Sequence, residues 1–224
     1  IIGCVLVLAG IVLIWPLQWP IPAIICLIYA AYMFLSTASY LYTTRRGKFV
    51  VWAQLLSQLR LRGDEQALDL GCGRGAVLLM VAKLLPQGRV TGVDLWKTSD
   101  QSGNALEVTE HNARLEGVAG RLELRTADMR KLPFADASFD LVVSSLAIHN
   151  IQDAQGRLQV IDEAVRVLKP GGRLLIADFR ATQPYPGRLQ ELGMAEVTHH
   201  ALGWRFWYGS PWAATKLVSA RKPA

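Results

Sequence analysis

The chain has 224 residues, of which 51% are hydrophobic, and it carries a formal net charge of +6. The apolar excess is concentrated: residues 1–44 contain no Asp, Glu, Lys, Arg or His, so every formal charge lies in residues 45–224. The length suits one full domain with an appendage. The three cysteines are too few and too scattered for a disulfide framework or a metal site, and we expect no metal.

Residues 1–44 predict a transmembrane helical hairpin. About 20 apolar residues in a helix span a hydrocarbon layer of roughly 30 Å, and two such runs occur, from Ile1 to about Trp15 and from Ile21 to about Tyr42. The intervening WPLQWPIP, with three prolines and two tryptophans, predicts a turn at the membrane surface. One spanning helix with a re-entrant one, a cleaved signal peptide, or a buried core helix are alternatives. Whether the natural N-terminus precedes Ile1 is left open.

The next segment predicts orientation. Arg45, Arg46 and Lys48 follow the second apolar run directly, and positive charges at this position favour the cytoplasmic side. We therefore expect an integral membrane protein whose soluble domain faces the cytoplasm. Residues 45–62 predict an amphipathic linker helix, with a shared apolar side made of Phe49, Trp52, Leu55, Leu56 and Leu59.

Residues 63–224 alternate short apolar runs with helical patterns. Such an order predicts an α/β domain with a parallel, doubly wound sheet, which binds ligands at the carboxyl ends of its strands. The expected strands are 67–70, 89–95, 121–128, 139–145, 172–179, 195–200 and 213–220.

The first strand leads into a glycine-rich loop, LDLGCGRGAV, in which Gly71, Gly73 and Gly75 allow close backbone approach to a ligand. The spacing also fits a dinucleotide site, so a nicotinamide dehydrogenase is a rival interpretation. Asp69, just before the loop, argues against it, because a carboxylate would repel a pyrophosphate and attract an ammonium or sulfonium group.

Further motifs follow in a fixed series: GVDLW with Asp94, TADMRKLPF with Asp128, SSLAIHNI after the fourth strand, and VLKPGGRLLIADF into the fifth. Together with the glycine loop, this series resembles the class I S-adenosylmethionine-dependent methyltransferases, in particular the branch that acts on small molecules, quinones or lipids. The resemblance is strong over about residues 63–183. It implies a seven-stranded Rossmann-like sheet and S-adenosyl-L-methionine as cofactor.

The resemblance also implies cofactor-binding roles, although strand-end or helix-capping roles are the alternative for each aspartate. Asp69 and the glycine loop would hold the methionine part, Asp94 both ribose hydroxyls, and Asp128 the adenine amino group. The implied cofactor-binding residues are Asp69, Gly71, Cys72, Gly73, Gly75, Asp94, Leu95, Asp128, Met129 and Ser145.

His149 is the candidate catalytic residue. It follows the fourth strand, in the segment that passes nearest the reacting methyl group in the family it resembles, and imidazole exchanges protons near neutral pH. A structural histidine that hydrogen-bonds a backbone carbonyl is the alternative.

The acceptor is predicted to be lipophilic. Where methyltransferases of nucleic-acid bases carry an Asn/Asp-Pro-Pro-aromatic tetrapeptide, this chain has SSLA, so no nucleic-acid partner is expected. The aromatic stretch WRFWYGSPW, residues 204–212, can line an acceptor pocket, lie in the headgroup layer or pack in the core. The sequence thus favours a membrane-anchored methyltransferase of a lipid or quinone; an anchored cofactor-binding protein without turnover is the alternative.

Overall fold

The computed structural model describes residues 2–15, 19–100 and 102–224, which form two compact units. The first contains Ile1–Lys48 and Gly203–Ala214, and the second contains Phe49–Leu202 and Thr215–Ala224, so the chain passes between them three times. The domain ranges expected from the sequence, 1–44, 45–62 and 63–224, remain a prediction, because the division into these two units does not test them. Residues 16–18 of the expected WPLQWPIP turn lie outside the described residues.

The second unit is built on a seven-stranded sheet of order β3-β2-β1-β4-β5-β7-β6. The strands are β1 (Gln66–Leu70), β2 (Arg89–Asp94), β3 (Leu122–Thr126), β4 (Phe139–Ser145), β5 (Leu168–Asp178), β6 (Ala195–Ala201) and β7 (Lys216–Arg221). Every strand expected from the sequence is present.

The sheet is mixed, which corrects the expectation of a purely parallel one. β7 pairs antiparallel with both β5 and β6. The reason lies in the connection between β6 and β7, which contains only the two short 3₁₀ turns Trp204–Phe206 and Pro211–Ala213. A parallel pairing would need a crossover connection, usually a helix.

Helices cover both faces of the sheet. Successive residues of β1, such as Leu68, Asp69 and Leu70, are all buried, as are Val142 and Val143 of β4, and side chains on neighbouring strand positions point to opposite faces. The helices of this unit are α3 (Lys48–Gln58, which begins one residue before the unit), α4 (Leu78–Leu84), α5 (Leu106–Leu115), α6 (Ala154–Val167) and α7 (Tyr185–Glu191).

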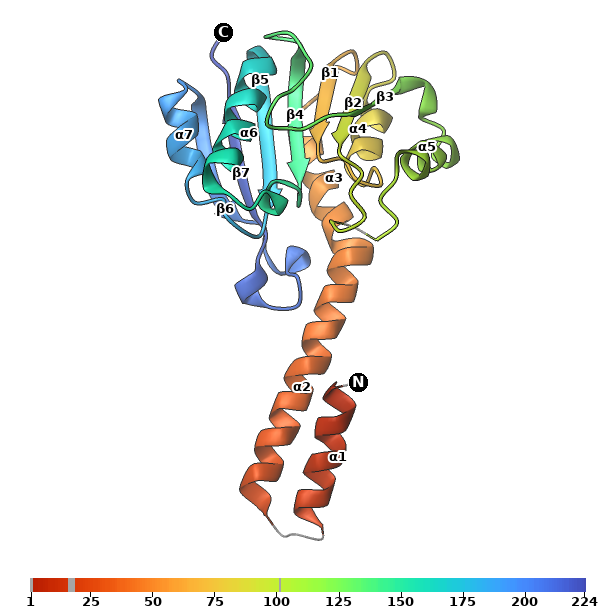
Figure 1. Cartoon of the computed structure of the whole chain (residues 1–224), viewed down its shortest axis with the longest axis vertical. Helices are drawn as coiled ribbons and strands as arrows, with labels where there is room; N and C mark the ends of the chain where they lie inside the picture. The colour runs from red at the N-terminus through yellow and green to blue at the C-terminus, as the bar shows by residue number, and fades with distance from the viewer. Residues whose placement is uncertain (1, 16–18, 101) are drawn as a thin grey trace. The chain divides into compact units, whose positions relative to one another are not determined.

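The topology brings the ends of distant strands together. The parallel pairings align Leu70 with Val93, Asp94 with Thr126, and Ser145 with Ala177, and the arrows of β4 and β5 point to the same edge of the sheet in Figure 1. This is the edge at which open α/β sheets bind ligands, and the candidate site residues lie along it.

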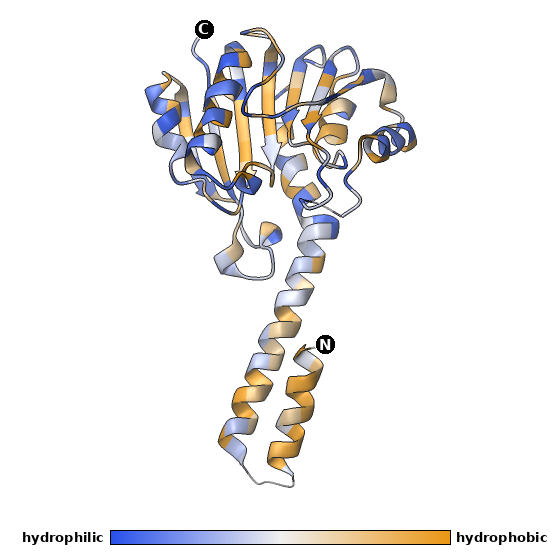
Figure 2. Ribbon diagram, viewed as in Figure 1, coloured by the Kyte–Doolittle hydropathy of each residue, from blue (hydrophilic) through white to orange (hydrophobic). Residues whose placement is uncertain are grey.

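The first unit consists of α1 (Ile2–Ile14), α2 (Pro20–Tyr42), the π-helical turn Thr43–Gly47, and the segment Gly203–Ala214, here called the aromatic loop. α1 and α2 pack through small residues: Gly3 lies under Phe34, Gly10 lies against Leu27, and Ala23 and Ala30 of α2 are buried. In Figure 2 the ribbon of α1 has the colour of hydrophobic residues along most of its length.

Helix length separates α1 from α2. Among the described residues, only the continuous helix Pro20–Gln58 is long and apolar enough to cross a membrane by length and composition. The 13 residues of α1 extend about 20 Å, which is short of the roughly 30 Å hydrocarbon layer. The structure therefore does not show a hairpin of two spanning helices.

Candidate functional site

The glycine loop after β1 folds tightly against the edge of the sheet. The amides of Gly71 and Cys72 both donate to the carbonyl of Val93 in β2, at 2.8 and 3.1 Å. Gly71 and Gly75 have φ of +70° and +88°, a region that residues with a Cβ rarely adopt. A Cβ at Gly71 would also collide with the Cβ of Ala147. The glycines therefore provide a backbone cradle that other residues would distort.

Asp69 places a carboxyl group in the interior beneath this cradle. It is 2% exposed, and burial raises its pKa from 3.8 to about 7, against the opposing effect of the Leu78 amide and with a further contribution from the negative charge of Asp94. A buried carboxyl in this state gains most from a ligand that brings positive charge. The residue thus fits a cofactor that carries an ammonium group.

Asp94 fastens the glycine loop to the end of β2. Its Oδ2 accepts from the amide of Gly73 at 2.9 Å, and its Oδ1 accepts from the amide of Trp96 at 2.7 Å and from Nδ2 of Asn104 at 3.2 Å. A carboxylate offers about four acceptor positions, so about one remains for a further donor. Both ribose hydroxyls would be accommodated only if one of these contacts gives way, most simply that of Asn104.

Leu95 follows Asp94 directly in the chain, and Cys72 belongs to the glycine loop that Asp94 holds. The side chain of Leu95 is large, apolar and 42% exposed, so it is available to a planar ligand group. Cys72 is buried, and burial raises the pKa of its thiol well above the ordinary value. Its side chain therefore fills space beside the loop as a neutral thiol.

Asp128 follows β3 and is paired with a residue that the sequence analysis did not single out. Arg130 donates from Nε and Nη2 to the Asp128 carboxylate, at 3.0 and 2.6 Å, and this contact lowers the pKa of Asp128. Met129 extends toward the glycine loop, because its Cε lies 3.2 Å from the position a Gly71 Cβ would take. Met129 thus borders the cradle directly, while Asp128 would have to share its oxygens with Arg130.

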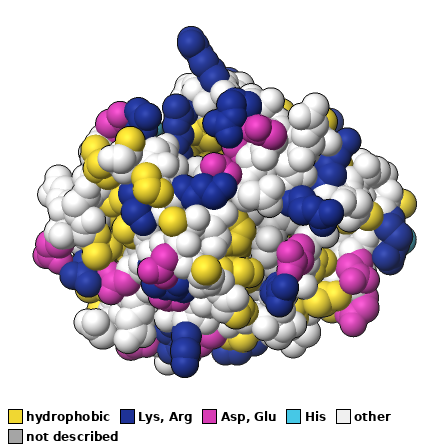
Figure 3. All heavy atoms as spheres, turned by 90° about the horizontal axis from the view of Figure 1, so that it is seen from above, with side chains coloured by type: hydrophobic (Ala, Val, Ile, Leu, Met, Phe, Trp, Pro, Cys, Tyr) yellow, Lys and Arg dark blue, Asp and Glu magenta, His cyan; other side chains and the backbone are white. Residues whose placement is uncertain are grey.

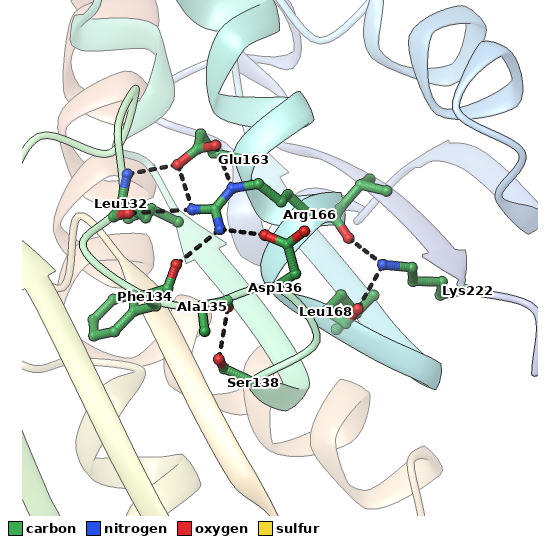
Figure 4. A network of polar contacts seen from close by, with 10 residues as sticks. Leu132, Phe134, Ala135, Asp136, Ser138, Glu163, Arg166, Leu168 and Lys222 are labelled. Atoms are coloured by element: carbon green, nitrogen blue, oxygen red, sulfur yellow. Dashed lines mark hydrogen bonds and ion pairs between the residues drawn. The ribbon is translucent and has the colours of Figure 1, made fainter.

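The segment that carries Asp128 and Met129 is held in place by α6. Arg166 of α6 pairs with Glu163 at 2.6 Å and Asp136 at 2.8 Å, and donates to the carbonyls of Phe134 and Leu132 (Figure 4). Glu163 also accepts from the amide of Leu132 at 2.6 Å. Because one guanidinium binds three groups of this connection, the connection between β3 and β4 is fixed to the helix.

Ser145 at the end of β4 contacts a residue far away in the sequence. Its Oγ accepts from the indole Nε1 of Trp52 at 2.9 Å, and Trp52 in α3 is 1% exposed. Leu55 and Leu56 are buried as well, whereas Phe49, expected on the same side, is 37% exposed. The helix before the first strand therefore packs on the β4 end of the site through Trp52.

His149 forms a pair with Asp178, a residue that the sequence analysis missed. Nδ1 of His149 lies 2.8 Å from Oδ1 of Asp178, which is ion-pairing distance, although the ring N–H is not aligned for a hydrogen bond. Oδ2 of the same carboxylate accepts from the backbone amide of His149 at 3.1 Å. The ring of Phe179 packs against the imidazole of His149, with the two ring centroids 4.7 Å apart.

The position of Asp178 carried a signal that was not used. It ends β5 in the motif LLIADF, as Asp94 ends β2, and it is 1% exposed. Aspartates at the ends of neighbouring parallel strands meet at one edge. Asp178 could therefore have been added to the series, but its partner His149 could not be identified from spacing.

These contacts converge on the glycine loop. Gly71 approaches Ala147 and Met129, Gly73 binds Asp94, and Ala147 stands two residues before His149. A cradle for a cationic ligand, a ribose-type acceptor position and a carboxylate-paired imidazole are thus assembled around one loop. No cluster of three or more His, Cys, Asp or Glu side chains suited to a metal ion occurs in the described part of the chain.

Known proteins with similar sequences are methyltransferases. Residues 68–176 match the family described as "Methyltransferase domain". The chain is 39% identical over 126 residues to Methyltransferase GfsG of Streptomyces halstedii, covering 56% of this chain and 42% of that protein. It is 33% identical to the ubiquinone/menaquinone biosynthesis C-methyltransferase UbiE of Geotalea daltonii, covering 55% and 49%. The chain thus spans about half the length of these curated relatives.

Solved structures show the same fold at low identity. The [4+2]-cyclase SpnF matches with a TM-score of 0.63 and 19% identity, covering 79% of this chain and 82% of that one. Its description as a cyclase illustrates that the fold alone does not decide the reaction. The family match covers residues 68–176, about half of the chain, and the fold is also that of a solved S-adenosylmethionine-dependent methyltransferase, so this chain is similar to that class of enzyme in both sequence and fold.

Proposed function

We propose that this protein is a membrane-anchored methyltransferase that transfers the methyl group of S-adenosylmethionine to a small lipophilic acceptor. The observation that carries the catalytic part is the pairing of His149 with the buried Asp178 at the edge that holds the cofactor cradle. An imidazole beside a buried carboxylate at this position supports proton transfer from an acceptor, which a protein that only bound the cofactor would not need.

In this proposal, residues at the carboxyl ends of the strands bind the cofactor. Asp69 receives the ammonium group, the cradle from Gly71 to Gly75, with Cys72, receives the methionine backbone, and Asp94 accepts from the ribose. Leu95 and Met129 flank the adenine, Asp128 binds its amino group once Arg130 shares the carboxylate, and Ser145, fixed by Trp52, borders the methionine part. The cofactor supplies an electrophilic methyl group on a sulfonium.

His149 acts on the acceptor. Asp178 faces Nδ1, which favours the tautomer with the proton on that nitrogen and leaves the lone pair of Nε2 for a proton of the acceptor. When the acceptor takes the methyl group that the cofactor would supply, Nε2 of His149 would receive the proton that the acceptor atom loses. Asp178 is a positioning residue that stabilises the resulting imidazolium.

The membrane part of the proposal rests on exposed apolar surface. Only 11% of the apolar 18-residue stretch in the helix Pro20–Gln58 is buried. Many large apolar side chains of α1 and α2 are exposed, including Ile2, Leu8, Ile21, Ile28 and Leu35. A buried core helix would not leave them so. A contiguous exposed surface of this kind is typical of a lipid contact. The catalytic domain would lie on the cytoplasmic side, after Arg45 and Arg46.

A small-molecule acceptor also agrees with the surface charge. Figure 3 shows acidic and basic side chains interspersed over the face that is uppermost in Figure 1, which is opposite the edge to which the arrows of β4 and β5 point, although the net charge is +6. Nucleic-acid binding usually requires clustered Lys and Arg. The relative UbiE is described as acting in quinone biosynthesis, which makes a quinone-like or other lipid acceptor the first to test.

The test is methyl transfer from radiolabelled S-adenosylmethionine by the full chain in a native lipid extract, with the label partitioned between organic and aqueous phases. Label in the organic phase is expected. His149→Ala should abolish most of this transfer with little change in calorimetric cofactor affinity, and Asp178→Asn should lower kcat more than it changes KM. His111→Ala, on the exposed side of α5, is the matched control. Confirmed cofactor binding without transfer to any extract would instead favour a binding protein.

A further inference from the structure

The aromatic loop, although inserted between two strands of the sheet, packs on the end of α2. The hydroxyl of Thr43 donates to the carbonyls of Trp207 at 2.6 Å and Arg205 at 3.4 Å, and Ser39 donates to the carbonyl of Trp207 at 3.4 Å. The ring of Trp204 stacks on Tyr42, with centroids 5.2 Å apart and 21° between the planes. Two regions separated by about 160 residues of chain thus share one packed surface.

Small residues on one face of the helix make this packing possible. A Cβ on Gly47 would collide with the carbonyl oxygen of Arg205, and a Cβ on Gly209, which has φ of +89°, would lie 2.8 Å from Oγ of Ser36. Ser36, Thr43 and Gly47 are spaced by seven and four residues, so they lie on one face of a helix. The loop is therefore seated on a surface that is shaped for it.

The contact has a defined depth along α2. It extends from Ser36 to Gly47, 11 residues or about 16 Å of helix axis, and it overlaps the point at which the uncharged segment ends and Arg45 and Arg46 begin. Each headgroup layer is about 5–8 Å thick. If α2 spans the bilayer, the loop reaches from the level of the first charges through the headgroup layer to the edge of the hydrocarbon.

The chemistry of the loop suits that depth. Trp204 and Trp212 are 55% and 86% exposed, and tryptophan is enriched at the membrane surface. The loop has no acidic residue, and its Arg205 is exposed, as are Arg45 and Arg46 of the helix. The carbonyls of Arg205 and Trp207 accept from the hydroxyls of Thr43 and Ser39, as non-helical backbone near the hydrocarbon requires.

We propose that the aromatic loop is a second membrane-contacting element of the anchor, held on α2 with Trp204 and Trp212 in the headgroup layer of an anionic lipid surface. This inference rests on the proposed membrane anchoring. It assigns the stretch WRFWYGSPW to lipid contact, among the three roles that the sequence left open.

The experiment places a fluorescent nitrobenzoxadiazole label at position 212. The full chain with Cys4→Ala, Cys26→Ala and Trp212→Cys is labelled and reconstituted in vesicles of phosphatidylcholine and phosphatidylserine that contain nitroxide lipids, with the nitroxide at the headgroup or deep in the acyl chain. Cys72 can stay, because it is buried as a neutral thiol. A label at Leu115→Cys, 73% exposed at the end of α5, is the control in the same background.

The label at 212 should shift to shorter wavelength and lose most of its emission to the headgroup nitroxide, whereas the label at 115 should not. Adding Gly209→Val, which removes the space beside Ser36, should abolish this quenching while cofactor affinity shows that the methyltransferase domain is folded. Replacing phosphatidylserine by phosphatidylcholine should weaken the quenching; equal quenching would contradict the anionic preference.

Two negative outcomes are distinguishable. If the label at 212 stays unquenched while the protein resists carbonate extraction from the vesicles, the loop does not contact the membrane and the anchor stands without it. If carbonate extracts the protein, the anchor itself fails, and the inference fails with it.

Discussion

Replacing Asp69 by Asn tests whether the buried carboxyl is kept for a cationic ligand. Burial raises its pKa from 3.8 to about 7, so in this range the folded protein holds a proton that the unfolded chain has lost. Stability without cofactor should therefore fall as the pH rises from about 4 through about 7. The full cost of about three pKa units is on the order of 4 kcal/mol, an upper figure, because local relaxation reduces it.

A large part of this loss of stability falls in a pH range in which unfolding can be measured. Between about pH 5.5 and about pH 7.5, the same pKa values give a loss of about 2 kcal/mol for Asp69. Asp69→Asn cannot ionise, so the free energy of unfolding of the variant, measured by urea denaturation, should exceed that of the native protein increasingly over this range. Asp64→Asn, on the exposed segment before β1, is the control and should leave the difference flat.

Cofactor binding should show the opposite pH dependence. Because the ionised carboxylate is the form that attracts an ammonium group, S-adenosylmethionine affinity should rise about 25-fold between about pH 5.5 and about pH 7.5, with proton release, and then level off. Calorimetry in two buffers of different ionisation enthalpy would count the proton. Asp69→Asn should bind more weakly, with most of this slope gone. A native affinity that is flat across this range, or a variant with the native slope, would refute the assignment of Asp69 to the ammonium group.

Two further predictions concern the neighbours of the cradle. Asp94→Ala should weaken cofactor binding by at least about tenfold, because it removes both the ribose acceptor and the contact to Gly73, each worth roughly 1.5 kcal/mol or more as hydrogen bonds to a charged group; unchanged calorimetric affinity would show that the end of β2 is not part of the site. Arg166→Met should lower the free energy of unfolding by about 2–3 kcal/mol and loosen the connection that carries Met129, whereas Arg114→Met, in an exposed pair with Glu110 at 3.8 Å, should cost less than about 0.5 kcal/mol. Equal losses for the two arginines would contradict the role given to Arg166.

The strands and the glycine loop could be predicted from the sequence because their signals are local. Each of the seven expected strands is a short segment of four to eight residues, and the glycines that bend the chain after β1 lie at alternate positions of one motif. Local signals also placed Asp69, Asp94 and Asp128 at strand ends. The direction of β7 could not be predicted in this way. Its antiparallel pairing depends on the length and content of the connection between β6 and β7, which the pattern of the strands does not contain.

The pairings of the site could not be predicted, since each joins residues that are distant in the chain. Trp52 and Ser145 are 93 residues apart, and His149, in the turn after β4, is 29 residues from Asp178, which ends β5. Asp128 shows the converse problem: its neighbour Arg130 is two residues away, but whether the two side chains turn toward each other depends on the local turn. Residue type and position therefore indicated which side chains could bind a cofactor, whereas their contacts with other side chains decide which of their atoms are available for it.

The carboxyl groups of Asp69, Asp94 and Asp128 differ in how many hydrogen-bond or charged partners the protein gives them, and this difference is informative about function. Asp94 receives three protein donors and Asp128 a guanidinium, so both carboxylates have partners without any ligand. Asp69 is the most buried of the three and has a raised pKa. A protein selected for stability alone would replace such a group by an apolar residue of similar size. Its retention next to a cradle of glycines is best explained by a ligand that supplies the missing charge, and perturbed groups of this kind are characteristic of binding sites.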